Sequence, residues 1–153
     1  MDMATRSSLI DYAALVRPDR VHGSLYTDPA IFEEELNRIW YREWVFVGHE
    51  SEVPNVGDYR TGLLGQQPIL ITRGHDMQVR VLLNRCTHRG NTICQARRGN
   101  APTFTCSYHG WTYKFDGALR HRLHAEAFDD CSAGDTNLVA LPCEERHGLL
   151  WVV

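Results

Sequence analysis

Two short segments of this 153-residue chain carry cysteine and histidine at spacings suited to binding metal. One residue separates Cys86 from His88, two separate Cys106 from His109, and seventeen residues, 89–105, lie between the two pairs. Each pair offers one thiolate and one imidazole. Two sulfur and two nitrogen ligands are the set that holds a two-iron, two-sulfur cluster in which histidines replace the cysteines on one iron. The sequence therefore predicts that these four residues bind the metal of such a cofactor.

A zinc site is the main alternative, because tetrahedral zinc also takes two cysteines and two histidines. Zinc boxes usually pair like ligands with two to four residues between them, whereas each segment here mixes its ligands. The helical patterning of a zinc finger is also missing around Cys106. Visible colour separates the two, since an iron-sulfur cluster absorbs visible light and zinc does not. Cys94 is expected to be a small buried apolar residue, with a role as substitute ligand as the alternative.

The residues around the two pairs resemble the N-terminal Rieske domain of the large (alpha) subunit of ring-hydroxylating aromatic dioxygenases. The similarity is close over residues 84–90 and 104–113 and looser from Thr27 to Leu119. It implies a mainly β fold, a Rieske-type antiparallel β-sandwich with a small cluster-binding subdomain and an N-terminal helix. The expected organisation is an arm and helix at 1–43 and a Rieske 2Fe-2S domain at 44–153, with the cluster-binding subdomain at about 84–117.

The same resemblance implies a role in electron transfer within an oxidoreductase. Such a domain accepts electrons from a reductase or ferredoxin and passes them to a mononuclear non-haem iron that activates O2. The mononuclear Fe(II) belongs to a catalytic domain that this chain is expected to lack, so no catalytic residue is assigned and the fragment is expected to transfer electrons only. The expected partners are the electron donor and the catalytic domain of a neighbouring subunit in a homo- or hetero-oligomer. A free-standing Rieske-type ferredoxin is the alternative function.

Four nearby residues bear on the reduction potential. Rieske proteins of respiratory cytochrome complexes carry two further cysteines that form a disulfide between the loops, and Asn91 and Tyr108 stand at those places here. Trp111 replaces a serine that donates to a bridging sulfide in that branch. Tyr113 matches a position whose hydroxyl approaches a cluster sulfur, with a half-buried strand tyrosine as the alternative reading. The resemblance implies a potential at the low end for Rieske centres.

Composition limits the remaining function classes. A net charge of -3 gives no basic stripe for nucleic acid, and no apolar run approaches the ~20 residues that cross a bilayer. The polar N-terminus lacks the features of a secretory signal, so a cytoplasmic location is expected. Besides the two predicted ligands the chain has three cysteines, Cys94, Cys131 and Cys143, and an odd remainder argues against a secreted disulfide framework.

The remaining pattern predicts one helix and many short strands. Asp28 followed by Pro29 is typical of a helix start, and apolar residues at helical spacing extend the helix to about Arg42. The expected apolar face consists of Phe32, Leu36, Ile39 and Trp40. Strands are expected at residues 44–47, 58–64, 69–73, 79–83, 104–106, 111–115 and 149–153, with hairpin turns at 74–76 and 116–117. The acidic stretch from His121 to Asp135 is predicted to be a solvated loop rather than a second metal site.

Overall fold

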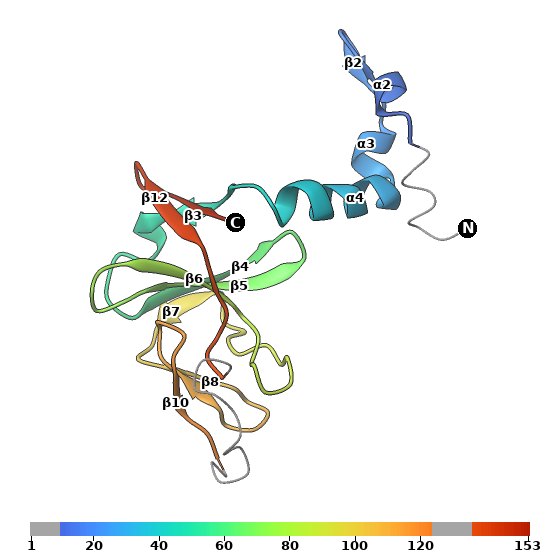
Figure 1. The fold of residues 1–153 in the computed structure, drawn as a ribbon. Helices are drawn as coiled ribbons and strands as arrows, with labels where there is room; N and C mark the ends of the chain where they lie inside the picture. The colour runs from blue at the N-terminus through green and yellow to red at the C-terminus, as the bar shows by residue number, and fades with distance from the viewer. Residues whose placement is uncertain (1–9, 124–135) are drawn as a thin grey trace. The chain divides into compact units, whose positions relative to one another are not determined.

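The computed structural model describes residues 10–123 and 136–153 (Figure 1). The chain divides into two units, Met1–Glu43 and Trp44–Val153. Within the described residues, no helix has the length and apolar character needed to cross a membrane. The assignment of the second unit as a cluster-binding domain, with a subdomain at about 84–117, stays a prediction at this point.

The first unit contains short helices and one small hairpin. Helix α4 (Pro29–Glu35) begins as predicted, with Pro29 in its first turn and the Asp28 carboxylate accepting from the Ala30 N–H. The helix continues as a π turn, η1 (Leu36–Trp40), and therefore ends two residues before the predicted Arg42. The preceding elements are α2 (Tyr12–Leu15), β1 (Val16–Arg17), β2 (Arg20–Val21) and α3 (Ser24–Thr27).

The apolar face of this helical segment was only partly predicted. Leu36 is buried as expected, but Ile31 takes the buried position expected for Phe32, and both Phe32 and Ile39 are exposed. A π turn adds a residue to the helical repeat, so residues beyond its start rotate away from the face that a 3.6-residue period predicts. The exposure of Ile39 follows from this rotation.

The second unit is built on a five-stranded antiparallel sheet of order β11-β6-β5-β4-β7, in which β4, β5 and β6 lie side by side (Figure 1). Its strands are β4 (Asp58–Leu64), β5 (Gln67–Arg73), β6 (Val79–Leu83), β7 (Arg98–Asn100) and β11 (Ala140–Leu141). β4 and β6 have the predicted bounds, and β5 begins two residues before the predicted Ile69. Leu70 of β5 pairs with Leu82 of β6, and both are fully buried. This pair forms part of the core beneath the cysteine and histidine loops.

Two three-stranded antiparallel sheets complete the second unit, in the orders β12-β13-β3 and β10-β9-β8. Their strands are β3 (Val45–His49), β12 (Cys143–Arg146), β13 (Leu149–Val152), β8 (Phe104–Thr105), β9 (Thr112–Tyr113) and β10 (Leu119–His121), and a 3-10 turn, η2 (Glu50–Glu52), follows β3. The prediction of a mainly β, antiparallel fold is confirmed. The predicted hairpin turn between β9 and β10 is closed by Gly117, whose φ of 87° suits glycine and whose Cα faces Leu82 at the core.

Arg73, at the end of β5, is a buried cation that satisfies three backbone carbonyls. Its guanidinium donates to the carbonyl oxygens of Val53, Met77 and Glu50 at 2.8, 2.7 and 3.2 Å. Arg73→Met keeps much of the side-chain volume but removes the guanidinium donor from all three carbonyls, of which that of Glu50 keeps the Val53 N–H as a donor. We therefore expect a loss of about 3 kcal/mol in the free energy of unfolding, measured by urea denaturation.

Arg80 provides the matched control, because it lies opposite Thr72, the neighbour of Arg73, on the adjacent strand. Arg80 forms an ion pair with Asp76 at 2.6 Å near the surface. Exposed ion pairs contribute little to stability, so Arg80→Met should cost much less than Arg73→Met. Equal losses from the two variants would contradict the role assigned to Arg73.

Candidate metal centre

The first cysteine and histidine pair lies in a tight turn that follows β6. The Cys86 N–H donates to the Asn91 carbonyl at 2.8 Å, and the Gly90 N–H donates to the Cys86 carbonyl at 2.7 Å. Gly90 has a φ of 71°, in the left-handed region that glycine adopts without steric cost. This turn buries Cys86 and leaves His88 half-buried at its rim.

The second pair lies in a turn of the same construction, between β8 and β9. The Cys106 N–H donates to the Trp111 carbonyl at 2.8 Å, and the Gly110 N–H donates to the Cys106 carbonyl at 3.0 Å. Gly110 has a φ of 70°. Cys106 is buried, and His109 is half-buried, so each turn presents its sulfur inward and its imidazole nearer the surface.

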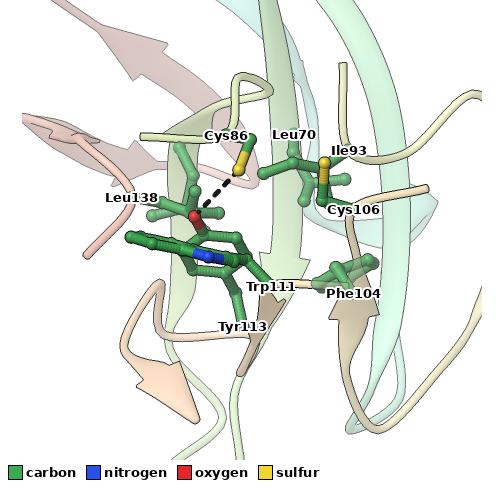
Figure 2. Packing of buried hydrophobic residues seen from close by; sticks show 9 residues of the cluster. Leu70, Cys86, Ile93, Phe104, Cys106, Trp111, Tyr113 and Leu138 are labelled. Atoms are coloured by element: carbon green, nitrogen blue, oxygen red, sulfur yellow. Dashed lines mark hydrogen bonds between the residues drawn. The ribbon is translucent and has the colours of Figure 1, made fainter. Parts of the chain in front are cut away.

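The two turns bring the four residues together in like pairs. The ring centroids of His88 and His109 are 4.6 Å apart, and the Cys86 side chain lies close enough to Cys106 to influence the pKa of its thiol. Both cysteines belong to one buried cluster (Figure 2), with Leu70, Leu82, Ile93, Phe104, Trp111, Tyr113 and Leu138. Over residues 10–123 and 136–153, no three or more His, Cys, Asp and Glu side chains gather at one point. A two-iron cluster with mixed ligands needs pairs, two cysteines for one iron and two histidines for the other.

The histidines have the chemistry that a bound metal requires. The Nδ1 atoms of His88 and His109 are both shielded from solvent, and that of His109 has no hydrogen-bond partner among the described residues. A buried polar atom without a partner costs free energy, and coordination of a metal at that nitrogen would remove the cost. Burial, the adjacent His109 and then Arg89 lower the pKa of His88, which favours the neutral imidazole that metal binding needs.

The environment of Cys106 favours the thiolate. Burial raises the pKa of its thiol, but hydrogen bonds from the Tyr108 and His109 backbone N–H groups and from the Asn91 amide outweigh burial and hold the pKa below its usual value. Asn91 Nδ2 lies 3.6 Å from the Cys106 sulfur. The thiolate is the form of cysteine that binds metal, so these donors prepare Cys106 for that role.

Aromatic side chains differ in how they contact the two histidines. The Trp111 ring is stacked on the His88 ring, with centroids 5.0 Å apart and planes within 7°, and Trp111 is only 4% exposed. The Tyr108 ring contacts His109 with centroids 3.8 Å apart but is 59% exposed. Trp111 therefore shields its histidine from water, whereas Tyr108 lies at the surface.

Tyr113 of β9 reaches the sulfur of Cys86. Its hydroxyl oxygen lies 3.2 Å from the Cys86 Sγ, as the dashed line in Figure 2 shows. Tyr113 is fully buried, rather than the half-buried strand residue of the alternative reading. Burial first, and then the hydrogen bond with Cys86, raise the pKa of Tyr113, so its hydroxyl keeps its hydrogen.

Cys94 packs against the buried cluster that contains Cys86 and Cys106. Cys94 is half-buried, and its backbone N–H and carbonyl are both held by the Asn84 side-chain amide, at 2.9 and 2.7 Å. Cys143 lies in β12, and Cys131 falls outside the described residues. The four cysteines within the described residues form no disulfide. Of the acidic stretch from His121 to Asp135, residues 124–135 also fall outside the described residues.

Sequence reasoning missed the contribution of Asn91. It was noted only as a replacement for a cysteine found in another branch, whereas its carbonyl accepts from Cys86 and its amide donates to Cys106. Asn91 therefore links the two turns. A hydrogen bond of this kind depends on how two loops meet in space, and the residue type alone carried no signal for it.

Comparison with known proteins places this geometry in a family. The Rieske [2Fe-2S] domain family matches residues 43–143. The biphenyl 2,3-dioxygenase subunit alpha of Rhodococcus jostii strain RHA1 is 47% identical over 111 residues, 71% of this chain and 24% of the relative. A benzene 1,2-dioxygenase subunit alpha of Pseudomonas putida is 44% identical over 133 residues, 86% of this chain and 30% of the relative. The structure of naphthalene 1,2-dioxygenase from Rhodococcus sp. bound to indole superimposes with a TM-score of 0.80 at 32% identity, covering 86% of this chain and 31% of that one. The chain thus spans a quarter to a third of the relatives it matches.

Proposed function

Since the chain belongs to the Rieske [2Fe-2S] domain family, we propose that it is the electron-transfer domain of a ring-hydroxylating dioxygenase alpha subunit. In this proposal Cys86 and Cys106 bind one iron of a 2Fe-2S cluster, and His88 and His109 bind the other. The observation that carries it is the pairing of two buried cysteines with two histidines, of which His109 has a shielded Nδ1 without a partner among the described residues. When bound, the cluster supplies a one-electron acceptor and donor.

The cysteines, the histidines and the side chains next to them have different proposed roles around that cluster. The buried cysteines anchor the cofactor to the core, while the half-buried histidines are the proposed ligands nearest to solvent. A partner protein can therefore approach the histidine side most closely. Trp111, stacked on His88, keeps water from that imidazole, and Tyr113 and Asn91 place hydrogen-bond donors at the two ligand sulfurs.

We propose the electron donor and the electron acceptor from the same similarity to dioxygenase alpha subunits. The proposed electron donor is a cytoplasmic reductase or ferredoxin, and the proposed acceptor is a mononuclear Fe(II) in a catalytic domain that reacts O2 with an aromatic compound. The names of two relatives, a biphenyl dioxygenase and a benzene dioxygenase, support this class of substrate.

Anaerobic purification followed by iron, sulfide and zinc analysis tests the proposed cofactor. We expect about two irons and two sulfides per chain and a visible absorption that dithionite bleaches. Colourless protein that carries zinc, or that stays iron-free after reconstitution, would exclude the cluster. Oxidation of an aromatic compound by a longer protein that contains this chain distinguishes an oxygenase domain from a free-standing ferredoxin.

Asn91→Leu is expected to lower the reduction potential, because it removes the amide donor to the Cys106 sulfur while keeping the shape of the side chain. Hydrogen bonds to ligand sulfurs favour the more negative, reduced state. A bond of about 0.5 to 1.5 kcal/mol corresponds to a fall of roughly 20 to 60 mV for a one-electron couple, measured by redox titration.

Thr105→Val is the control for this prediction. Thr105 is adjacent to Cys106, but its hydroxyl pairs with the Thr112 hydroxyl at 2.9 Å rather than with a sulfur. The reduction potential of Thr105→Val should match that of the unmodified protein. A potential unchanged in Asn91→Leu would show that the amide does not act on the bound cluster.

A further inference from the structure

We propose that Thr87 tunes the reduction potential by competing with Cys86 for the hydroxyl hydrogen of Tyr113. Thr87 lies between two proposed ligands and is a positioning residue, because it acts through Tyr113 and not on the metal. This inference rests on the proposed function, in which Cys86 is bound to iron as a thiolate.

Three contacts at hydrogen-bond distance join the Thr87 and Tyr113 hydroxyls to each other, to the Cys86 sulfur and to the Thr136 carbonyl. The Tyr113 hydroxyl oxygen lies 3.2 Å from the Cys86 Sγ and 3.1 Å from the Thr87 Oγ1. The Thr87 Oγ1 in turn lies 2.8 Å from the carbonyl oxygen of Thr136. Tyr113 and Thr136 are buried and Thr87 is half-buried, so these groups must satisfy each other within the protein.

Counting hydrogens fixes the direction of each bond. A hydroxyl has one hydrogen to donate, and a carbonyl can only accept. The Thr87 hydrogen therefore goes to Thr136, and toward Tyr113 the Thr87 oxygen can only accept. Within the part of the chain that the structure describes, the hydrogen of Tyr113 consequently has two acceptors within reach, the oxygen of Thr87 and the sulfur of Cys86.

The state of Cys86 decides how this competition matters. A free Cys86 thiol has its own hydrogen and can donate to Tyr113, which leaves the Tyr113 hydrogen for Thr87. A metal-bound thiolate has none, so Tyr113 is then the donor in their contact. When the Tyr113 hydroxyl donates partly to Thr87, its hydrogen bond to the Cys86 sulfur is weaker. A weaker hydrogen bond to that sulfur lowers the reduction potential.

Thr87→Val removes the competing oxygen at nearly constant volume, so the potential is expected to rise. We expect about a threefold higher ratio of reduced to oxidised protein at a fixed ambient potential, or roughly 28 mV for a one-electron couple. Thr87→Ser keeps the hydroxyl and should retain the original potential. Thr87→Ala serves as a second test of the same direction if the valine variant fails to fold.

A double-mutant cycle with Tyr113→Phe separates this mechanism from a general effect of the mutation. Tyr113→Phe should lower the potential, and Thr87→Val should produce no further shift in that background, because no hydroxyl hydrogen remains to be redirected. All potentials are measured on purified protein by redox titration followed through the electron paramagnetic resonance signal.

Two results would overturn the inference while leaving the proposed function intact. One is a potential that stays constant or falls in Thr87→Val, and the other is a shift of equal size with and without the Tyr113 hydroxyl. Unmodified protein that assembles no iron-sulfur cluster would instead overturn the proposed function, and the inference with it.

Discussion

Cys106→Ala is expected to reduce bound iron from about two atoms per chain to none, and Cys86→Ala should do the same. Each cysteine is buried, and alanine offers no donor atom in its place. In each variant one cysteine remains, and it cannot hold its iron alone because each iron needs two protein ligands. Iron and sulfide analysis after anaerobic reconstitution measures this loss, together with the disappearance of visible absorption.

Cys94→Ala is the matched control for both variants. Cys94 lies eight residues after Cys86 and is half-buried, but its backbone is held by Asn84 and its thiol is directed to the Ala96 carbonyl at 3.6 Å. This variant should bind as much iron as the unmodified chain. Loss of iron in Cys94→Ala, with iron retained in Cys86→Ala, would make Cys94 a ligand and refute the assignment.

Trp111→Ala is expected to lower the free energy of unfolding by about 3–5 kcal/mol, the range for removing a large aromatic side chain from a packed core. Trp111 packs in the same buried cluster as the two cysteines and is stacked on His88. Its removal also opens the His88 ring to water, so the loaded protein should lose its visible absorption faster in air. Urea denaturation and the rate of bleaching measure the two effects.

Tyr108→Ala provides the comparison for an aromatic residue at the rim. Tyr108 contacts the His109 ring but is exposed, so its removal should cost less than about 1 kcal/mol. If Trp111→Ala and Tyr108→Ala destabilised the protein equally, the shielding role assigned to Trp111 would be wrong.

The strands that the sequence predicted best are those that lie between clear turn residues. β4 and β6 have the predicted bounds because turn or polar residues flank both strands. β7 (Arg98–Asn100) and β12 (Cys143–Arg146) were missed, since short polar strands become visible only through their partners, β4 and β13. The π turn at Leu36–Trp40 likewise has no signature in a helical apolar pattern.

The candidate site was predictable at the level of ligand types and spacing. The hydrogen bonds around it were not, because they join residues that are distant in sequence. Thr87 meets Thr136 from 49 positions away, and Asn91 meets Cys106 across two loops. Tyr113 could be singled out only through its place in the second motif, and its burial required the packed core around it.

The most direct test of the mixed ligand set is nitrogen hyperfine coupling in the low-temperature electron paramagnetic resonance of dithionite-reduced protein. Two imidazole nitrogens bound to one iron should give couplings from two nitrogen nuclei, and labelling histidine with ¹⁵N should change both. His109→Cys, if loaded, should retain only one. A paramagnetic signal without nitrogen coupling, or reduced protein without any signal, would contradict the assignment of His88 and His109 as ligands.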